Sequence, residues 1–390
     1  MKPLIFLNSH PIQYFVPLYK QITTSTTICL QVMYCSEAGL KSHKDSGFGT
    51  NIQWDIPLLN GYSSIFFRNY AIKPSLNSFW GLFNPGIISF LWKQPRSVVV
   101  IHGWGSLSNI LAIIAAKVKG HIVCLRAETP WHQEKMKNKW VTPIKHLYLR
   151  CLFTLVDCFL FIGMQNRLFY KKMHVPDNRL YFAPYCVDNF RFSSFAEEMN
   201  KAELKALLYP KKQNKMILYS GKYTVKKRPL DLIAAFIKLN RTDIMLVMVG
   251  EGELRPQMEQ MIRDNNVREQ VMLTGFVNQS NIARYYAVAD VFVMCSGLGE
   301  TWGLSVNEAM NFNLPLVVSD STGCSFDLVK EGSNGYIFPE GDIDALANAI
   351  NKCLHFTEEE QKKVSEINKS LLETYSYTTI IHTLNELCNN

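Results

Sequence analysis

The sequence lacks the features of a membrane-spanning, secreted or zinc-binding protein. No apolar run reaches the roughly 18 residues that a transmembrane helix needs, and the longest, residues 151–164, contains Asp157. The first apolar stretch turns polar at Asn8, too early for the apolar core of a signal peptide. The ten cysteines include no CxxC pair and no His/Cys cluster at zinc spacing. We therefore expect a reduced, cytoplasmic protein without a disulfide framework or a structural metal.

The length and charge of the chain indicate more than one domain. Its 390 residues suffice for two or three domains, and the 47% of hydrophobic residues exclude a disordered chain. Residues 1–200 contain 21 Lys/Arg against 10 Asp/Glu, whereas residues 201–390 contain 20 against 23. A basic first half and a nearly neutral second half indicate that the two halves bind different partners.

Short apolar runs alternate with helix-length segments in both halves. Nearly continuous apolar runs of this kind predict buried strands of parallel sheets, covered by helices on both faces. The predicted strands are residues 4–7, 28–34, 98–101, 122–125, 159–162 and 180–182 in the first half, and 216–219, 244–249, 271–273, 291–294 and 316–318 in the second. The sequence therefore predicts α/β architecture twice along the chain.

The domain limits follow from the same pattern. Residues 188–215 contain no strand pattern, and the second part of this stretch, 196–215, is polar, so the joint between the halves is expected within 188–215. We predict a first domain over residues 1–205, a second over 206–365, and a C-terminal helical segment over 366–390 that crosses back to the first domain. A helix is also expected at 106–119, and its predicted core-facing stripe consists of Leu107, Ile110, Leu111, Ile114 and Ala115.

Candidate phosphate-binding residues follow the predicted strand at 216–219. Gly221 allows the backbone to approach a ligand closely, and Lys222 with the three cations at 226–228 places four positive charges within seven residues. Both features suit a phosphate or diphosphate. A solvated surface loop is the alternative of equal weight.

Two other segments have weaker implications. Gly250 and Gly252 resemble the start of a dinucleotide fingerprint, but no third glycine follows and neighbouring glutamates would repel a pyrophosphate, so only a tight turn is expected. Asp342 and Asp344 form a D-x-D pair of the kind that can hold a divalent metal. Because a helical pattern follows directly, helix capping is the favoured role.

The segment from Gly297 to Met310 has the strongest chemical pattern in the second half. Glycines at 297, 299 and 303 open a helix, and free backbone N–H groups at a helix start favour anionic oxygens. Glu300 lies in the loop and Glu308 about one turn into the helix. Carboxylates beside a diphosphate need hydroxyl groups as hydrogen-bond donors, so a sugar and a ribose are natural partners. The alternative is an ordinary helix N-terminus, at which acidic side chains are favoured by the helix dipole.

Polar side chains also follow the predicted strands of the first half. His10, His102, Arg126 and Glu128 each come at or just after the carboxyl end of a strand. If these strands are parallel neighbours, the four side chains open onto one edge of the sheet, where they could orient an acceptor hydroxyl or balance the charge of a leaving phosphate. Trp104, between two glycines, could stack on a sugar ring or belong to the core.

A basic, amphipathic segment occupies residues 117–172. It contains 11 Lys/Arg against three acids, interleaved with aromatic and aliphatic residues. Such a surface can lie on anionic lipid, gaining about 1 kcal/mol per cation near the membrane. An ordinary core with solvated lysines is the alternative of equal weight. No nucleic-acid-binding motif accompanies the segment, so nucleic acid is not an expected partner.

The segment ETWGLSVNE, residues 300–308, resembles the E-x7-E motif of retaining glycosyltransferase family 4. The resemblance continues through SGKYTVKKRP, VGEG, TGFV, LPLVVSD, EGSNGYIFPEGD and APYCVDNFRF. HPIQYF, GFGTNIQWDIPLLNGY, LFNPG, IHGWG and LRAE are similar to a bacterial branch of this family associated with surface-polysaccharide assembly. The resemblance covers nearly the whole chain. It implies the GT-B fold, in which two Rossmann-like, doubly wound parallel-sheet domains face each other across a cleft.

The resemblance also implies roles for individual residues. Lys222 and Lys227 correspond to diphosphate-binding positions, Glu308 to the acid that holds the ribose hydroxyls, and Glu300 to the acid that contacts the donor sugar. Lys227 and Glu300 are therefore candidate catalytic residues. The remaining donor-binding candidates are Gly221, Gly250, Phe276, Val277, Thr301, Trp302, Gly303 and Leu304, with the backbone of residues 275–277 bordering the base.

The sequence departs from the family pattern at four sites. Tyr185-Cys186 replaces the usual Asn-Gly before Val187 and Asp188. Lys222 replaces the usual Arg, which keeps the charge but loses the planar fork. Trp302 replaces a common Phe, which would narrow the sugar pocket. Arg126 and Glu128 stand where many relatives have a His, so the candidate catalytic residues of the first half are His102, Arg126 and Glu128. The same three residues, with His10 and Trp104, are the candidate acceptor-binding residues.

The sequence thus predicts a retaining, metal-independent glycosyltransferase of the hexosyltransferase type. Its donor would be a nucleotide diphosphate sugar, its acceptor a hydroxyl of a glycan or lipid-linked glycan, and its role the synthesis of cell-surface polysaccharide or lipopolysaccharide. No cofactor is expected, and a peripheral contact with the inner face of the cytoplasmic membrane is a further prediction. The alternatives are a GT-B nucleotide-sugar epimerase and a catalytically silent, membrane-associated binding protein.

Overall fold

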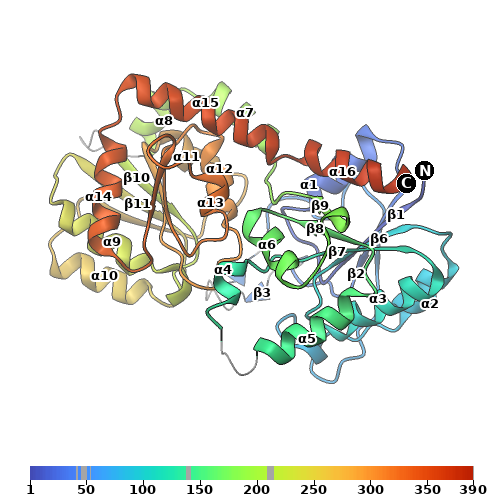
Figure 1. Ribbon diagram of the computed structural model, residues 1–390. Coiled ribbons are helices and arrows are strands. Elements are labelled where there is room, and N and C mark those ends of the chain that lie inside the picture. The colour runs from blue at the N-terminus through green and yellow to red at the C-terminus, as the bar shows by residue number, and fades with distance from the viewer. Residues whose placement is uncertain (41–42, 45–50, 53, 138–141, 209–214, 390) are drawn as a thin grey trace. The chain divides into compact units, whose positions relative to one another are not determined.

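The chain folds into two compact units, each built around one parallel sheet (Figure 1). The computed structural model describes residues 1–40, 43–44, 51–52, 54–137, 142–208 and 215–389. The first unit comprises Met1–Ser42, Ile56–Tyr185 and Ser376–Asn390, and the second comprises His43–Asp55 and Cys186–Tyr375. The predicted α/β class with two Rossmann-like domains is confirmed.

The first unit contains a seven-stranded sheet in the order β5-β2-β1-β6-β7-β8-β9. All of its neighbouring strands are parallel. Its strands are β1 (Leu4–Asn8), β2 (Leu30–Tyr34), β5 (Ser64–Phe66), β6 (Val98–His102), β7 (Ile122–Arg126), β8 (Cys158–Phe161) and β9 (Leu180–Phe182). The strand order changes direction between β1 and β6, which is the point where open parallel sheets bind ligands.

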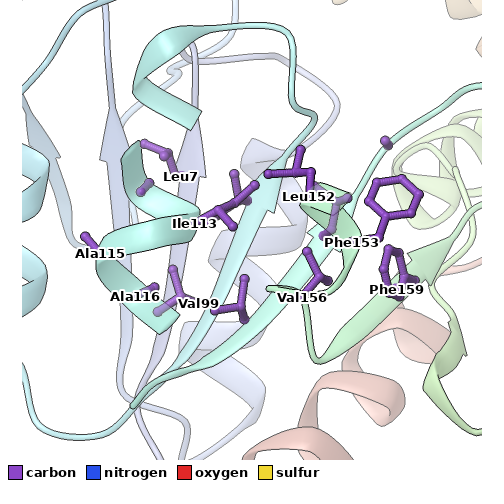
Figure 2. Close-up of a cluster of buried hydrophobic side chains, with 14 of the residues drawn as sticks. Leu7, Val99, Ile113, Ala115, Ala116, Leu152, Phe153, Val156 and Phe159 are labelled. Atoms are coloured by element: carbon purple, nitrogen blue, oxygen red, sulfur yellow. The ribbon is translucent and has the colours of Figure 1, made fainter. Parts of the chain in front are cut away.

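Helices cover both faces of this sheet because strand side chains alternate between the faces. On one face, Leu7, Val99 and Phe159 pack with apolar residues of four helices (Figure 2). These helices are α2 (Gly86–Lys93), α3 (Leu107–Lys119), α5 (Thr142–Phe153) and α6 (Met164–Lys172). On the other face Phe6 contacts Tyr19 of α1 (Val16–Ser25), and α1 packs against α16 (Tyr377–Asn389). Full burial of each large apolar side chain contributes about 1.5–3 kcal/mol relative to exposure.

Helix α3 occupies the predicted range, but its buried face differs from the predicted stripe. Ser106 caps the helix by accepting a hydrogen bond from the backbone N–H of Asn109. The buried residues are Ser108, Asn109, Ala112, Ile113, Ala115 and Ala116, whereas Ile114 is exposed. The prediction is confirmed for Ala115 and wrong for Ile114, because an apolar helix offers several faces and small residues at 112, 115 and 116 allow closer packing on the sheet.

The second unit contains a six-stranded sheet in the order β12-β11-β10-β13-β14-β15, again with parallel neighbours. Its strands are β10 (Lys215–Ser220), β11 (Ile244–Val249), β12 (Val271–Gly275), β13 (Val291–Met294), β14 (Leu316–Ser319) and β15 (Gly335–Phe338). The order changes direction between β10 and β13, so a second ligand-binding edge is expected at their carboxyl ends.

Two helical layers cover this second sheet as well. Ile217, Leu246 and Val293 pack with one layer, consisting of α9 (Pro229–Leu239), α10 (Arg255–Asp264) and α14 (Ile343–Leu354). The unit's other helices are α7 (Asn189–Glu198), α8 (Lys201–Leu208), α11 (Ala283–Val288), α12 (Leu304–Met310), α13 (Ser325–Leu328) and α15 (Glu358–Thr374). Among them α11 contacts α7 and α8, and α12 contacts α15.

The chain passes between the units at places that differ from the predicted domain limits. The second unit begins at Cys186, before the predicted limit at 205, because α7 and α8 pack on α11. The C-terminal crossing begins at Ser376, after the predicted limit at 366, because α15 packs on α12. Helix α16 belongs to the first unit, where the backbone N–H of Lys2 donates to the carbonyl of Cys388 at 2.8 Å.

All eleven predicted strands coincide with strands of the two sheets. Two sheet strands, β5 and β15, had no strand prediction. Both lie at an edge of their sheet, where strands need not be continuously apolar. The remaining described elements are a two-stranded antiparallel pair, β3 (His43–Lys44) and β4 (Asn51–Ile52), a short helix α4 (Trp131–Glu134), and the 3-10 turns Phe79–Gly81, Asp177–Arg179 and Val225–Lys227.

Candidate functional site

Glycine-containing loops meet where the strand order of the second sheet reverses. Gly221 follows β10, and Gly250 follows the neighbouring strand β11. Gly250 has a φ of 151°, and a Cβ atom at this position would overlap with the carbonyl oxygen of Gly221. Only glycine permits such a close approach of the two loops. The predicted phosphate-binding glycine is thus placed at the ligand-binding edge of the sheet.

Lys227 and Glu300 form an ion pair at this edge. Lys227 ends the 3-10 turn η3 (Val225–Lys227), and Glu300 lies in the loop between β13 and α12. The Nζ atom of Lys226 lies 3.7 Å from the Oε2 atom of the same carboxylate. The side chain of Lys227 is 17% exposed and that of Lys226 46% exposed. Lys227 is therefore the cation that the protein surrounds.

The two lysines keep Glu300 ionised. Burial alone would raise the pKa of the Glu300 carboxyl, but the positive charges of Lys227 and then Lys226 lower its pKa below the usual value. A nearby opposite charge favours the charged form of an acid. The cluster therefore presents a buried carboxylate that can accept hydroxyl hydrogen bonds beside two ammonium groups that can bind phosphate oxygens.

Glu308 lies on α12 and is almost completely buried, with 2% of its surface exposed. Its Oε2 atom accepts a hydrogen bond of 2.7 Å from the hydroxyl of Tyr286 on α11. Helix α12 begins after Gly303, whose φ is 108° and whose added Cβ would lie 2.7 Å from the Sδ atom of Met294. The glycine thus permits the sharp turn between Glu300 and Glu308.

Trp302 points into the second unit. Its Nε1–H donates to Oδ1 of Asn307 at 2.9 Å, and its ring centroid lies 5.6 Å from that of Tyr375. The side chain therefore braces the loop against Tyr375, a contact that the sequence did not predict. Thr301 and Leu304, the other predicted donor-binding residues of this loop, are half-buried on either side of it.

Phe276 and Val277 follow β12 and are half-buried. The ring of Trp54 lies 6.0 Å from that of Phe276 at an interplanar angle of 63°, and Asp55 accepts a hydrogen bond from the backbone N–H of Ser280 at 3.2 Å. Sequence reasoning placed Trp54 and Asp55 in a segment similar to the family but gave them no role in the site. Their distance along the chain left no local signal that could have placed them beside the predicted base-binding residues.

The cations predicted to bind phosphate do not have equivalent surroundings. Lys222 lies on the loop after β10, where its backbone carbonyl accepts a hydrogen bond of 2.9 Å from the hydroxyl of Tyr219. Arg228 is engaged by two acids of the unit, Asp231 at 2.6 Å and Glu340 at 3.4 Å. Arg228 is therefore held by acids outside the cluster, whereas Lys226 and Lys227 contact Glu300.

Polar residues of the first unit meet at the carboxyl ends of β1, β6 and β7, which are neighbours in the sheet. A pocket of about 390 Å³ is lined there by four predicted acceptor-site residues, His102, Trp104, Arg126 and Glu128. Its other lining residues are Ser9, Ile12, Phe15, Gly103, Gly105, Ala127, Thr129 and Lys145. The fifth predicted residue, His10, lies next to the lining residue Ser9, with its Nδ1 atom 2.9 Å from the Ser9 hydroxyl.

His102 and Arg126 occupy an aromatic environment in this pocket. The Arg126 guanidinium lies over the rings of Phe15 and Tyr185, at 4.9 and 4.8 Å from the ring centroids. Burial, and then the charge of Arg126, lower the pKa of His102 well below its usual value, so its ring is neutral at neutral pH. Sequence reasoning gave Phe15 and Tyr185 no role in this pocket, because an aromatic residue in an apolar stretch looks like ordinary core.

Part of the predicted basic surface at 117–172 is engaged in internal ion pairs. Glu134 has a completely buried side chain that accepts hydrogen bonds from Lys137 at 2.8 Å and Lys145 at 2.6 Å. Lys117 pairs with Asp157 at 2.5 Å. These pairs reduce the number of cations that this surface can offer to an outside partner.

Within the part of the chain that the structure describes, no helix has the length and apolar character needed to cross a membrane. Nor do the described residues gather three or more His, Cys, Asp or Glu side chains in a metal-binding arrangement. The D-x-D pair starts α14, where the side chain of Asp342 accepts a hydrogen bond of 2.9 Å from the backbone N–H of Ala345. The predicted capping role is confirmed.

The second unit matches a known protein family. Residues 200–370 match the family model described as glycosyl transferases group 1. The matched range includes the strands, the loops and the two glutamates of the site in this unit.

Curated relatives resemble the chain over part of its length. An uncharacterized glycosyltransferase of Methanocaldococcus jannaschii is 33% identical over 168 residues, which cover 43% of this chain and 42% of the relative. The amylovoran biosynthesis glycosyltransferase AmsK of Erwinia amylovora is 36% identical over 105 residues, or 26% of each chain. The chain thus spans less than half the length of these two relatives.

Solved structures share the whole fold. The Anabaena protein Alr3699/HepE, crystallised in complex with UDP and glucose, aligns over 100% of both chains with a TM-score of 0.74 and 15% sequence identity. At this identity the likeness concerns the fold. Residues 200–370 are therefore similar to glycosyl transferases group 1, and the two parallel-sheet units have the GT-B fold.

Proposed function

We propose that the protein is a retaining glycosyltransferase that moves a sugar from a nucleotide diphosphate sugar to a hydroxyl group of a glycan or lipid-linked glycan. The observation that carries the proposal is the cluster of Lys226, Lys227 and Glu300 at the switch point of the second sheet. It combines cations suited to a diphosphate with a buried, ionised carboxylate suited to sugar hydroxyls. The group 1 match over residues 200–370 supports the same reading.

The proposed reaction breaks the bond between the anomeric carbon and the phosphate oxygen of the donor. The electron pair of that bond passes to the leaving diphosphate, and the anomeric carbon becomes oxocarbenium-like. The acceptor oxygen then bonds to the same face of this carbon, and its proton passes to the departing phosphate oxygen. Lys222 and Lys227 would stabilise the charge that develops on the diphosphate, which is where preorganised donors accelerate such a step.

The donor would be held without a metal ion in this proposal. The ammonium groups of Lys222, Lys226 and Lys227 would supply the positive charge that a divalent ion supplies elsewhere. Glu300 would bind hydroxyl groups of the sugar, and Glu308, oriented by Tyr286, would bind those of the ribose. The UDP and glucose in the structure of the Anabaena protein support a nucleotide donor of this class.

The proposed donor class is tested with UDP-, GDP- and ADP-sugars. Binding is measured by thermal shift, and the donor that stabilises the protein most is then incubated with glycan acceptors, with and without EDTA. Retention is read from the anomeric configuration of the product by NMR. Saturable binding of one donor, transfer with retention and resistance to EDTA are expected. Glu300→Gln should abolish transfer, and Glu366→Gln, a control at an exposed acid of α15, should not.

Three results would contradict this function. The absence of saturable binding for every sugar nucleotide would remove the donor assignment. An inverted product would overturn the retaining mechanism, and loss of transfer in EDTA would overturn metal independence. Conversion of the donor without an acceptor would identify an epimerase instead.

The proposed acceptor belongs to cell-surface polysaccharide or lipopolysaccharide synthesis, and its binding place would be the pocket of the first unit. The pocket is lined by residues that can bind hydroxyls, among them His102 and Glu128, and by the indole of Trp104. The relative AmsK, which takes part in amylovoran biosynthesis by its name, supports a polysaccharide product. Transfer to glycan primers rather than to small alcohols or to water is the expected result.

We further propose that the first unit makes a peripheral contact with an anionic membrane at its cytoplasmic face. Helix α5 exposes Ile144, Leu147 and Tyr148, and Lys135 and Arg150 line a neighbouring pocket. Apolar side chains flanked by cations fit an anionic bilayer surface, where each cation contributes about 1 kcal/mol.

Vesicle flotation tests this contact. The protein should float with vesicles that contain phosphatidylglycerol. With vesicles of phosphatidylcholine alone it should remain at the bottom of the gradient. Joint replacement Ile144→Asp and Leu147→Asp should abolish flotation. Val118→Asp, which changes an equally exposed apolar residue of α3, should not. Equal flotation with both lipids, or no effect of the double substitution, would exclude the contact.

A further inference from the structure

Arg126 is a buried cation without an acidic partner among the described residues. The residue is 5% exposed, and its nearest hydrogen-bond acceptor is the backbone carbonyl of Pro184, 3.4 Å from one terminal nitrogen. The other terminal nitrogen is buried and has no partner in the described part of the chain. The guanidinium nevertheless lines the 390 Å³ pocket of the first unit. An anion entering the pocket would therefore meet a positive charge that the described residues leave without an acidic partner.

The energetics of burial make this arrangement informative. A buried charge is costly unless it is paired and hydrogen-bonded. The rings of Phe15 and Tyr185 offset part of the cost, because a cation over an aromatic face is attracted by it. They cannot replace the acceptors that the planar N–H groups of arginine require. The same rings hold the guanidinium in one orientation. A fixed guanidinium favours binding of a planar or tetrahedral oxygen anion rather than of water alone.

The other ionisable groups of the pocket leave this role to Arg126. Lys145 donates a hydrogen bond of 2.6 Å to the buried Glu134, whose negative charge balances that of the lysine. His102 is held neutral, and its Nε2 atom is buried without a hydrogen-bond partner among the described residues. Glu128 carries the one negative charge of the lining and raises the pKa of Tyr185, after the larger effect of burial. Glu128 suits an acceptor hydroxyl, whereas Arg126 suits an anion.

We propose that the acceptor carries an anionic oxygen group, a carboxylate or a phosphate, and that Arg126 binds it. This inference rests on the proposed function, because it specifies the acceptor class of the pocket in the first unit. The pocket volume of about 390 Å³ lies in the ordinary range of small-molecule sites. One sugar ring with its charged substituent on Arg126 and a hydroxyl near His102 and Glu128 satisfies each polar group named above.

Glucose, glucuronate and glucose 6-phosphate form a matched set of probes, since they differ only at C6. Their dissociation constants are measured by ligand-observed NMR with the full chain, at constant ionic strength and without nucleotide. At least one of the two anions should bind about tenfold more tightly than glucose, as expected for a charge-assisted hydrogen bond. Tighter binding of glucuronate points to a carboxylate and tighter binding of glucose 6-phosphate to a phosphate.

Substitutions then assign the effect to one side chain. Arg126→Gln should remove the preference for the anion, and Arg126→Lys should keep part of it, because the charge remains without the planar fork. Arg167→Gln is the matched control, since Arg167 also lies over an aromatic ring of the first unit but pairs with Asp177. Glu128→Gln should retain or strengthen anion binding, because it removes the opposing charge.

Several outcomes would overturn the proposal. Equal affinity for glucose and both anions would do so even if Arg126→Gln fails to fold, because that comparison uses the unmodified protein. Anion binding that survives in Arg126→Gln would place the anion elsewhere. If Arg126→Gln weakens UDP binding and leaves the acid sugars unaffected, Arg126 serves the donor. The affinities for glucose and the two anions are measured without nucleotide. Failure of sugar transfer would therefore contradict the proposed function and leave the proposed anion site unaffected.

Discussion

Replacing Lys227 with methionine tests the charge at the centre of the candidate donor site. Methionine keeps a long flexible side chain but removes the ammonium group paired with Glu300. Removing one partner of a buried pair costs about 3–5 kcal/mol when the remaining charge is uncompensated. Lys226 still lies 3.7 Å from the carboxylate. We therefore expect the free energy of unfolding to fall by about 2 kcal/mol at pH 7, within the range for a hydrogen bond to a charged group.

The effect on catalysis should be larger. If Lys227 stabilises the departing diphosphate, its loss removes one preorganised donor, which is worth about 2–4 kcal/mol of transition-state stabilisation. The turnover number should then fall about 30- to 1,000-fold. Binding of the sugar nucleotide should weaken less, because the charge that the lysine opposes develops mainly as the bond breaks.

The stability difference should depend on pH with a defined sign. The folded-state pKa of Glu300 is depressed, so the stabilisation is fully present above the unfolded-state pKa of about 4.3 and is lost as the pH falls through the folded-state pKa. In Lys227→Met, burial acts on Glu300 with one cation fewer, and its pKa rises. The difference in the free energy of unfolding between wild type and variant should therefore be largest at neutral pH and decrease towards pH 4.

Thermal unfolding and initial-rate assays with the best donor measure these effects. A loss of about 2 kcal/mol corresponds to a fall in Tm of roughly 4–8 °C for a unit of about 200 residues. Lys226→Met is the matched control, because this neighbouring cation is farther from Glu300 and more exposed. The reasoning is refuted if Lys227→Met is as stable and as active as Lys226→Met, or if its stability loss is the same at pH 7 and pH 4.

Three further predictions concern other parts of the two units. Glu308→Gln should raise the KM for the sugar nucleotide about tenfold or more. Tyr286→Phe leaves the acid in place and should raise the KM less. Equal effects of the two substitutions on the KM would contradict a direct role for the acid. Gly250→Ala should lower the free energy of unfolding by more than about 1 kcal/mol in urea. The reason is that the alanine Cβ would overlap with the facing carbonyl oxygen of Gly221 at a φ of 151°. An unchanged urea midpoint of unfolding would refute the close contact. Asp342→Ala should cost about 1 kcal/mol of unfolding free energy through loss of the helix cap, and no change would show that the cap contributes nothing.

The strands and the chemical motifs were predictable because their signals are local. A strand buried on both faces is a nearly continuous apolar run, and all eleven such runs are strands. The motif from Glu300 to Glu308 is likewise contiguous, so its position between strand and helix could be derived from glycine spacing. The edge strand β5, the buried face of α3 and the crossings at Cys186 and Ser376 were not predictable, because packing against other elements decides them.

The sequence by itself determined the α/β architecture, the order of the loops that hold candidate ligand-binding residues, and the excess of positive charge in the first half. Only the tertiary structure decided which of the positive charges in either half remain available. It paired Lys227 with Glu300, engaged Arg228 and Lys145 with acids, and left Arg126 between two aromatic rings. The physical reason is that a charge is neutralised or left unpaired by neighbours within a few ångströms, and residues distant in the chain supply those neighbours.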